Sequence, residues 1–252
     1  MVPKFRRTNP PQTPTPSPNS NPMKAAVLVS GGMDSVTALY DTASRQEATL
    51  VISFNYGSKH NAREIPFARW HAQNLNLPFL LLDLPFIGQF FSSHLLLGGG
   101  EIPKGHYEEQ TMRQTVVPFR NGIFLSIAAG LAESHGCDTL VIAAHSGDHA
   151  IYPDCRETFL QAMQEAIRLG TYANIRLLRP FVGMDKTAIA KRGAQLGVDF
   201  SKTWSCYVGG EIHCGECGTC IERREAFLKA NLPDPTHYLK TPPIPPKPTP
   251  CT

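Results

Sequence analysis

The sequence lacks both of the common glycine-rich nucleotide motifs. Its 252 residues contain neither a G-x-x-x-x-G-K-[ST] pattern nor a G-x-G-x-x-G pattern, which argues against a Walker-type loop and a Rossmann dinucleotide loop. The chain also has no apolar run that approaches membrane-spanning length, and its first residues lack the apolar region of a signal peptide. We therefore expect a cytoplasmic protein that has no membrane partner.

The folded part of the chain lacks an excess of positive charge. The whole chain holds 24 Lys and Arg residues against 21 Asp and Glu residues, but residues 1–22 and 233–252 contribute five of the basic residues and one of the acidic ones. The interior keeps 19 basic and 20 acidic residues. A nucleic-acid-binding domain needs a basic footprint, so we expect no nucleic-acid partner.

Proline is scarce in the interior and abundant at both ends. Residues 1–22 hold seven prolines and residues 233–252 hold eight, of 22 in the chain. This composition predicts two disordered or extended tails, and the proximity of Met23 to the first strand suggests that residues 1–22 are an upstream extension. We divide the rest into an α/β domain, residues 23–200, and a cysteine-rich segment with its helix, residues 201–232.

The hexapeptide S-G-G-M-D-S at residues 30–35 is the strongest local signal. It follows the apolar run of residues 25–29 and precedes a segment, residues 36–45, that can form a helix. A strand, a glycine turn and a helix N-terminus together present unpaired N–H groups to one point, which predicts a phosphate site. An ordinary turn with a helix cap is the alternative. A carboxylate beside a phosphate makes sense if a divalent metal lies between them, which explains Asp34.

Apolar runs and helix-like segments alternate along the domain. We expect strands at residues 25–29, 49–54, 79–82, 138–144 and 175–178, with helices between them. This alternation predicts a doubly wound, mainly parallel α/β sheet with its ligand at the carboxyl edge of the strands. Residues 84–114 break the pattern, and a lid, a partner surface and a disordered loop all remain open for them.

Several polar loops follow the predicted strands. Tyr56, Lys59 and His60 are candidates for binding, although a polar turn is the better explanation of any one of them. The loop at residues 145–156 is dense in polar residues, including two acids and an arginine, and it follows a buried strand, which favours substrate recognition. Lys186 opens a later helix, where it reaches a phosphate or faces solvent.

Four cysteines form a C-x₇-C-x₂-C-x₂-C pattern at Cys206, Cys214, Cys217 and Cys220. Two-residue gaps let thiolates converge on one tetrahedral ion, which predicts a structural zinc site. His213 can replace one ligand, but support of a ligand is its better interpretation. An iron–sulfur cluster is the main rival, because the same ligands suit it.

The motifs resemble those of a known family. Residues 30–35 look like the S-G-G-x-D-S loop of the PP-loop ATP pyrophosphatases. V-P-F-R-N at residues 117–121, Y-P-D-C-R at 152–156, and T-W-S-C at 203–206 with H-C-G-E-C-G-T-C at 213–220 resemble the 7-cyano-7-deazaguanine synthases of queuosine biosynthesis. The resemblance runs in order over residues 23–231; Ser58 departs from it, because the family pattern has glutamine there.

The resemblance implies an ATP-dependent ligase that converts 7-carboxy-7-deazaguanine and ammonium into the nitrile through adenylated intermediates. It implies ATP, Mg²⁺ and one structural Zn²⁺ per subunit, in a homodimer. The catalytic residues expected on this basis are Asp34, Ser35, Arg120, Asp148, Asp154 and Arg156. The residues expected to bind the nucleotide are Leu28, Val29, Ser30, Gly31, Gly32, Met33, Asp34, Ser35, Val36, Thr37, Ala38 and Lys186.

Within the substrate site, the N–H edge of a deazaguanine needs an acceptor such as Asp148 or Asp154. Arg120 or Arg156 would meet a carboxylate or phosphate. Two other functions remain open: a tRNA-thiolating PP-loop enzyme, against which the acids beside Cys155 argue, and an inactive ATP- or zinc-binding module, against which the complete loop argues.

Overall fold

The computed structural model describes residues 23–106 and 110–244 of the chain. The predictions for residues 1–22 and 245–252 lie outside this described part. The described chain contains a five-stranded parallel sheet with the strand order β3-β2-β1-β4-β5. The strands are β1 (Ala25–Leu28), β2 (Ala48–Asn55), β3 (Phe79–Asp83), β4 (Thr139–Val141) and β5 (Arg176–Leu178). The predicted doubly wound α/β class is therefore confirmed.

Seven α-helices and four short 3₁₀-helices connect the strands within the described residues. The α-helices are α1 (Met33–Ser44), α2 (Asn61–Asn74), α3 (Pro85–Phe90), α4 (Arg120–Ser134), α5 (Glu157–Gly170), α6 (Lys186–Gln195) and α7 (Gly218–Ala230). The 3₁₀-helices are η1 (Gln110–Thr115), η2 (Ser146–Ala150), η3 (Pro153–Cys155) and η4 (Phe200–Lys202).

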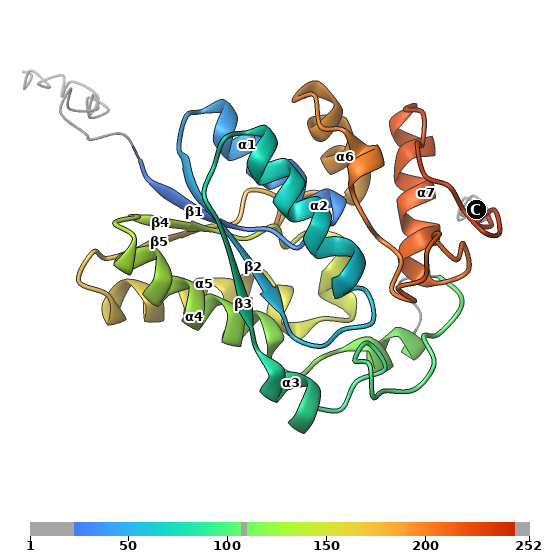
Figure 1. The fold of residues 1–252 in the computed structure, drawn as a ribbon, viewed down its shortest axis with the longest axis horizontal. Coiled ribbons are helices and arrows are strands. Elements are labelled where there is room, and N and C mark those ends of the chain that lie inside the picture. Colours follow the sequence, from blue (N-terminus) through green and yellow to red (C-terminus); the bar gives the residue numbers. More distant parts are fainter. Residues whose placement is uncertain (1–22, 107–109, 245–252) are drawn as a thin grey trace, which may run out of the picture.

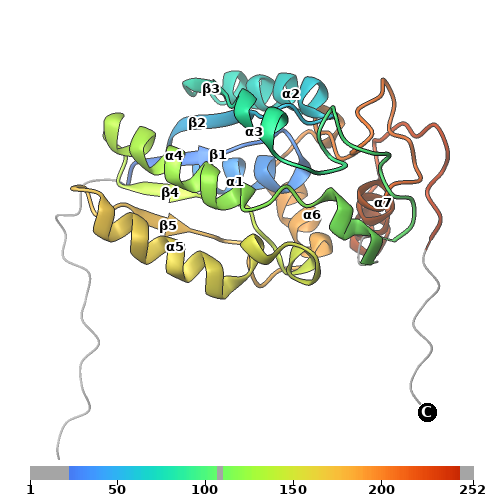
Figure 2. The same cartoon turned by 90° about the horizontal axis from the view of Figure 1, so that it is seen from below.

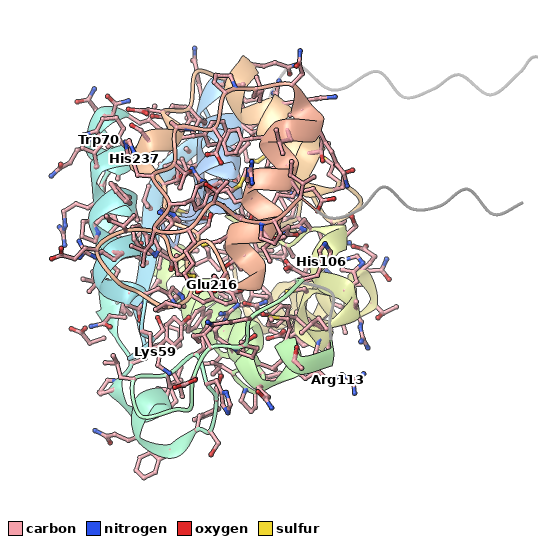
Figure 3. The ribbon with its side chains drawn as sticks, turned by 90° about the vertical axis from the view of Figure 1, so that its right-hand side faces the viewer. Lys59, Trp70, His106, Arg113, Glu216 and His237 are labelled. Carbon is pink, nitrogen blue, oxygen red and sulfur yellow. The ribbon has the colours of Figure 1, made fainter. Side chains whose placement is uncertain are left out.

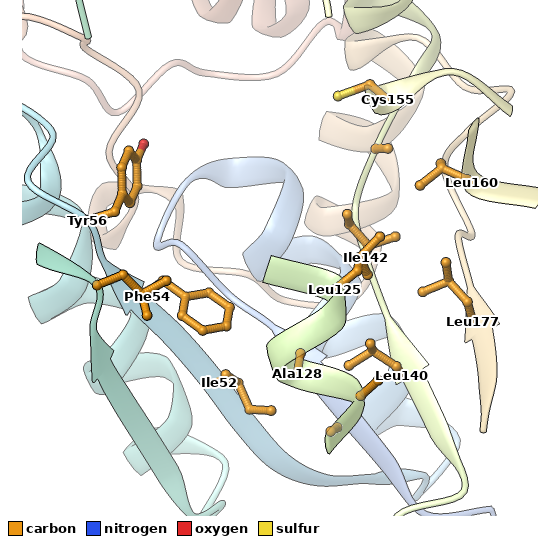
Figure 4. Packing of buried hydrophobic residues seen from close by; sticks show 14 of the residues in the cluster. Ile52, Phe54, Tyr56, Leu125, Ala128, Leu140, Ile142, Cys155, Leu160 and Leu177 are labelled. Atoms are coloured by element: carbon orange, nitrogen blue, oxygen red, sulfur yellow. The ribbon is translucent and has the colours of Figure 1, made fainter. Parts of the chain in front are cut away.

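The helices cover both faces of the sheet. Figures 1 and 2 show α1 and α2 on one face and α4 and α5 on the other. Successive strand residues point to opposite faces, so Ala26 packs in the cluster with α4 and α5, whereas Val27 packs in the cluster with α1, α2 and α6. Figure 4 shows the first cluster, where Leu125 and Ala128 of α4 face Leu140. Burial on both faces explains why the strands read as continuous apolar runs.

The order in which the chain adds strands to the sheet reverses between β1 and β4. From β1 the chain builds β2 and β3 on one side, and then crosses to β4 and β5 on the other side. Loops that leave the carboxyl ends of β1 and β4 consequently diverge and leave a crevice between them. The segment S-G-G-M-D-S leaves β1, and the polar loop at residues 145–156 leaves β4, so both predicted binding loops meet at this crevice.

Strand β4 is shorter than the predicted run of residues 138–144. It ends at Val141, and its neighbour β5 ends at Leu178. Ile142 N–H still donates to Leu178 C=O (3.0 Å), but beyond this bond β4 has no further strand partner on that side. The residues after Ile142 are therefore free to turn toward the crevice.

The irregular segment at residues 84–114 packs against the domain where it is described. It contains α3 and the start of η1, and Leu95, Leu96 and Met112 are buried within it or at its end. Lys59 (Figure 3) donates from Nζ to the carbonyls of His94 (2.5 Å) and Gly100 (2.6 Å). Lys59 thus fastens this segment instead of facing a ligand.

One described helical stretch, Thr111–Ser134, is long and apolar enough to span a membrane by length and hydropathy alone. The sequence analysis predicted no such run. In the 18-residue apolar part of the stretch, 44% of the residues are buried, and α4 packs on the sheet through Leu125, Ala128 and Ala132. This burial is the behaviour of a core helix.

Candidate active site

The loop at residues 30–35 has the geometry of an anion cradle. Gly31 has a φ of +106°, and a Cβ there would lie 2.0 Å from the carbonyl oxygen of Glu64, so only glycine fits. Gly32 caps the N-terminus of α1, and the twelve-residue helix directs its positive end toward the loop.

The two serine hydroxyls of the loop bond to each other and to the loop backbone. Ser30 N–H donates to Ser35 Oγ (3.1 Å), Gly32 N–H donates to Ser30 Oγ (3.1 Å), and Ser35 Oγ donates to Gly32 C=O (3.1 Å). The hydroxyls therefore fix the shape of the loop.

The predicted nucleotide-binding residues separate into two groups. Those that line the cavity are Leu28, Val29, Ser30, Gly32, Met33, Asp34, Ser35 and Lys186. Val36, Thr37 and Ala38 are fully buried in α1, and Thr37 Oγ1 donates to Met33 C=O (2.7 Å). Gly31 supports the loop from beneath, without lining the cavity.

A charge cluster lies beside the loop. Lys186 Nζ is 3.3 Å from Asp34 Oδ2 and 2.6 Å from Glu222 Oε2. Burial by itself lowers the pKa of Lys186, but the carboxylates of Asp34, Glu222 and Asp148 outweigh it and raise the pKa above its usual value. Lys186 is therefore a cation at the loop. Glu222, which holds it there from α7, carried no signal in the sequence, because a glutamate on a helix is ordinary.

Asp34 also faces His145, whose Nε2 lies 3.7 Å from Asp34 Oδ2 and 3.6 Å from Asp148 Oδ2. The other oxygen, Asp34 Oδ1, is buried and has no hydrogen-bond partner among the described residues. A buried, unpartnered carboxylate oxygen suits a hard cation such as Mg²⁺. The donors present therefore fit the predicted ion.

An aromatic wall forms the other end of the cavity. It includes Tyr56, Phe124 and Tyr207, with Phe124 edge-on to Tyr56 at 5.4 Å between ring centroids. Arg120 lies over the Tyr56 ring at 5.8 Å, and its Nη1 is 3.4 Å from Tyr56 Oη. Burial lowers the pKa of Arg120, but acidic groups led by Tyr56 and Asp154 hold that pKa well above its usual value. A permanent cation therefore faces a flat apolar surface.

Only one of the three site residues predicted in the loop at residues 145–156 lines the cavity. Asp148 lines the cavity. Asp154 and Arg156 do not: Asp154 Oδ2 accepts from Asn121 N–H (2.8 Å) at the start of α4, and Arg156 is exposed, with Nε donating to His149 C=O (2.9 Å). Their surroundings are those of residues that hold the loop in place.

Glu64 lines the cavity and was missed in the sequence. It lies in the first turn of α2, where a glutamate is common and signals nothing. Burial is the main cause that raises the pKa of Glu64 to about 8; Arg120 opposes this shift and Asp34 adds to it. Its Oε2 is 3.5 Å from His60 Nε2, and burial lowers the pKa of His60 to about 3. Glu64 thus faces a neutral imidazole.

The four predicted cysteines come together. The Sγ atoms of Cys206, Cys214, Cys217 and Cys220 all lie within 4.8 Å of one another, so they could hold a metal ion. His213 lies outside this group. It accepts from Ser205 N–H (3.2 Å) at Nε2, and its ring is 4.0 Å from the Trp204 ring, so it supports the segment that leads into Cys206.

The cysteine segment reaches the cavity through Trp204 and Ser205. Trp204 N–H donates to Gly31 C=O (3.0 Å). The fully buried guanidinium of Arg223 donates to Thr203 Oγ1 (2.9 Å) and Ser205 Oγ (3.1 Å), on either side of Trp204. It also donates to Thr236 Oγ1 (2.6 Å). The described start of the predicted C-terminal tail, residues 233–244, therefore includes contacts with the cysteine segment.

The second described cavity lies on the far side of Lys186, between α6 and α7. Its lining includes Lys186, Glu222, Glu225 and His106, and His106 Nε2 is 3.5 Å from Glu225 Oε2. Figure 3 shows His106 on the segment that leads toward Arg113. Lys186 thus separates this polar hollow from the main cavity.

The parallel sheet, the S-G-G-x-D-S loop at its switch point and the four-cysteine cluster define a doubly wound α/β protein of the PP-loop type with a C-terminal appendage whose cysteines could hold a metal ion. A family model described as queuosine biosynthesis protein QueC matches residues 24–231, and the chain belongs to this family. The resemblance drawn from the motifs is therefore confirmed.

Curated relatives match this chain over most of their own length. A protein of Porphyromonas gingivalis named 7-cyano-7-deazaguanine synthase is 57% identical over 84% of this chain and 96% of its own. A protein of the same name from Rhizobium johnstonii is 48% identical over 86% of this chain and 92% of its own. Among solved structures, NMN synthetase from Francisella tularensis has a TM-score of 0.45 at 12% identity, over 75% of this chain and 68% of that chain.

Proposed function

We propose that this protein is an ATP-dependent carbon–nitrogen ligase that converts 7-carboxy-7-deazaguanine and ammonia into 7-cyano-7-deazaguanine in queuosine biosynthesis. One observation carries the proposal: a single cavity joins a phosphate loop to an aromatic wall that bears a buried arginine. The relatives named 7-cyano-7-deazaguanine synthase support it, because the chain matches them over nearly their whole length.

The ATP phosphates would lie on the loop. The N-terminus of α1 and the loop N–H groups supply donors, and Lys186 supplies a positive charge. Mg²⁺, when bound, would neutralise phosphate charge and polarise the phosphorus. Asp34, with its unpartnered Oδ1, is the residue that would hold it.

The deazaguanine would lie at the aromatic wall, because a flat heterocycle buries its faces well against rings. Arg120 is the cation at this end and would pair with the substrate carboxylate. Of the acids expected to accept the N–H edge of the base, Asp148 lines the cavity and Asp154 does not, so we assign this role to Asp148.

The reaction would proceed by two activations. The substrate carboxylate attacks the α-phosphorus of ATP, and pyrophosphate leaves. Ammonia then attacks the acyl carbon, and AMP leaves with the bonding electron pair to give the amide. A second ATP activates the amide oxygen in the same way; AMP then leaves with the bonding electron pair, and release of both protons of the amide nitrogen gives the nitrile. The loop donors and Lys186 would stabilise charge that develops on the phosphates.

The four cysteines would hold a structural Zn²⁺, because four thiolates fill a tetrahedral shell. The same ligands suit an iron–sulfur cluster. An absorption spectrum separates the two, since zinc is colourless, and metal analysis of the purified protein identifies the ion. The family resemblance further supports a homodimer in the cytoplasm, and sedimentation of the purified protein tests the dimer.

The tRNA-thiolating alternative needs a reactive cysteine in the cavity. Burial is the main cause that raises the pKa of the Cys155 thiol well above its usual value, and Asp148 and Asp154 add to it. Asn121 Nδ2 also donates to Cys155 Sγ (3.1 Å). A neutral, buried thiol is a poor sulfur carrier, so nothing in the described cavity favours this function.

The decisive test incubates the protein with ATP, Mg²⁺, ammonium chloride and 7-carboxy-7-deazaguanine and measures AMP and nitrile by mass spectrometry. We expect nitrile together with substrate-dependent AMP; absence of such AMP would overturn the proposal. The Asp34→Ala variant should lose turnover while it keeps the metal content of the parent protein. Full activity of this variant would refute the role given to Asp34.

A further inference from the structure

Glu64 lies between the two halves of the cavity. Its backbone supports the phosphate loop from beneath, at the contact with Gly31, and its Oε1 lies 3.5 Å from the point where a Cβ of Gly32 would be. At the other end, Arg120 lines the same cavity as Glu64, and its charge opposes the rise in the pKa of Glu64. In the proposed function the acyl–adenylate bond joins the AMP on the loop to the substrate carboxyl at Arg120. In that function, Glu64 would lie beside the reacting carbon.

The other carboxylates of the cavity are committed elsewhere. Asp34 forms an ion pair with Lys186 and has the unpartnered oxygen that fits Mg²⁺. Asp148 faces His145. Among the described residues, Glu64 forms no ion pair with a lysine or arginine, and its neighbour His60 is neutral. A carboxyl group in this setting can take up and release a proton.

The reaction requires such a group. Ammonia is present in neutral solution almost entirely as ammonium, which has no lone pair with which to attack a carbonyl. A carboxylate beside aromatic rings attracts a small cation, and a base whose pKa is near the working pH transfers protons efficiently. Tyr207, stacked on His60 at 5.3 Å, and Tyr56 supply rings on this side of the cavity.

We propose that Glu64 binds ammonium in the cavity and accepts its proton, so that ammonia forms next to the acyl adenylate. The inference rests on the proposed function and adds a catalytic residue to it. One N–H bond of ammonium breaks and its proton moves to a Glu64 oxygen. The nitrogen lone pair forms the C–N bond, the bond from carbon to the phosphate oxygen breaks, and AMP leaves with that electron pair. The nitrogen loses its second surplus proton to water, and Glu64 later returns its own to solvent.

The test compares two nucleophiles in the Glu64→Gln variant. Hydroxylamine is mostly unprotonated at neutral pH, so it attacks an acyl adenylate without a base and gives a hydroxamate. With ammonium, we expect the variant to lose about 10²–10⁴-fold in kcat/KM. With hydroxylamine, it should form hydroxamate and AMP at close to the rate of the parent protein. Glu64→Asp, which keeps a base, should recover part of the ammonium-dependent rate.

Two controls make the result specific. Carboxylate-dependent exchange of pyrophosphate into ATP reports adenylation and folding, and Glu64→Gln should keep it. Glu101→Gln, an exposed position, should match the parent protein with both nucleophiles.

Three outcomes would overturn the inference. Equal loss with ammonium and hydroxylamine would mean that Glu64 serves only the phosphate loop. Undiminished activity of Glu64→Gln with ammonium would mean that it accepts no proton. If the parent protein forms AMP with neither nucleophile, the proposed function fails, and the inference fails with it.

Discussion

The backbone N–H of Trp204 donates a hydrogen bond to the carbonyl of Gly31, with 3.0 Å between nitrogen and oxygen. This bond joins the cysteine segment to the phosphate loop, although 173 positions of sequence separate the two residues. Arg223 fixes the residues on both sides of Trp204, and Cys206 follows two residues later. The cysteine cluster and the phosphate loop are thus parts of one structure.

Loss of the metal should weaken ATP binding. Without an ion, four thiols packed within 4.8 Å have no reason to stay together, and the bond from Trp204 to Gly31 loses its support. We expect Cys217→Ser to lower both the metal content and the affinity for ATP, measured by elemental analysis and calorimetry. Cys137→Ser is the matched control, because Cys137 is buried but outside the cluster. Normal ATP affinity in metal-free protein would contradict this coupling.

Gly31→Ala should destabilise the loop. The added Cβ would meet Glu64 C=O at 2.0 Å, and the φ of +106° is unfavourable for alanine. We expect a loss of about 1–3 kcal/mol in the free energy of unfolding, together with weaker ATP binding. Gly130→Ala in α4 has open space around it and should be neutral or slightly stabilising. Urea unfolding and ATP titration measure both; equal behaviour of the two variants would disprove the strain.

Substitutions of Asp148 and Asp154 should have different effects, the first on substrate binding and the second on stability. Asp154 accepts from Asn121 N–H at the start of α4, so Asp154→Ala should cost about 1–2 kcal/mol of stability by loss of a helix cap. Asp148 lines the cavity, so Asp148→Ala should raise KM for the carboxylate substrate and change the melting temperature little. Kinetics and thermal melting of both variants check this division. A stable Asp154→Ala protein with a raised KM would reverse the assignment.

Glu64 should make stability depend on pH. Burial raises its pKa to about 8 in the folded protein, from 4.5 as the reference value. The folded state then binds a proton that the unfolded state releases between these values, so this contribution is full below pH 4.5 and is lost as pH rises through about 8. From pH 6 to pH 9, we expect the parent protein to lose on the order of 1–3 kcal/mol more than Glu64→Gln. Urea unfolding at several pH values measures this difference, and parallel pH profiles would rule it out.

The sequence was most informative where a pattern is local. The strand at residues 25–29, the glycine turn and the helix after it follow from neighbouring residues, and so does the convergence of cysteines two residues apart. Strand length was less predictable: β4 ends at Val141 because its partner β5 is short.

Contacts between residues far apart in the sequence decide which side chains line the cavity. Asp154 and Arg156 lie in the motif Y-P-D-C-R and were predicted, like Asp148, to belong to the site. Only Asp148 lines the cavity. The reason is that Asp154 caps α4, a helix that begins 34 residues earlier in the chain. Glu222 and Glu64 carried no signal, because a glutamate on a helix is usually solvated.

The sequence by itself determined the parallel α/β class, the glycine turn with Asp34 at a helix start, and the convergence of the four cysteines, because each depends on periodicity or short spacing along the chain. Only the tertiary structure decided that Glu64 lies between the loop and Arg120, that Glu222 holds Lys186, and that Trp204 ties the cysteine segment to Gly31. These relationships arise where helices from distant parts of the chain pack on one end of the sheet, and burial there sets the charge state of the groups they bring together.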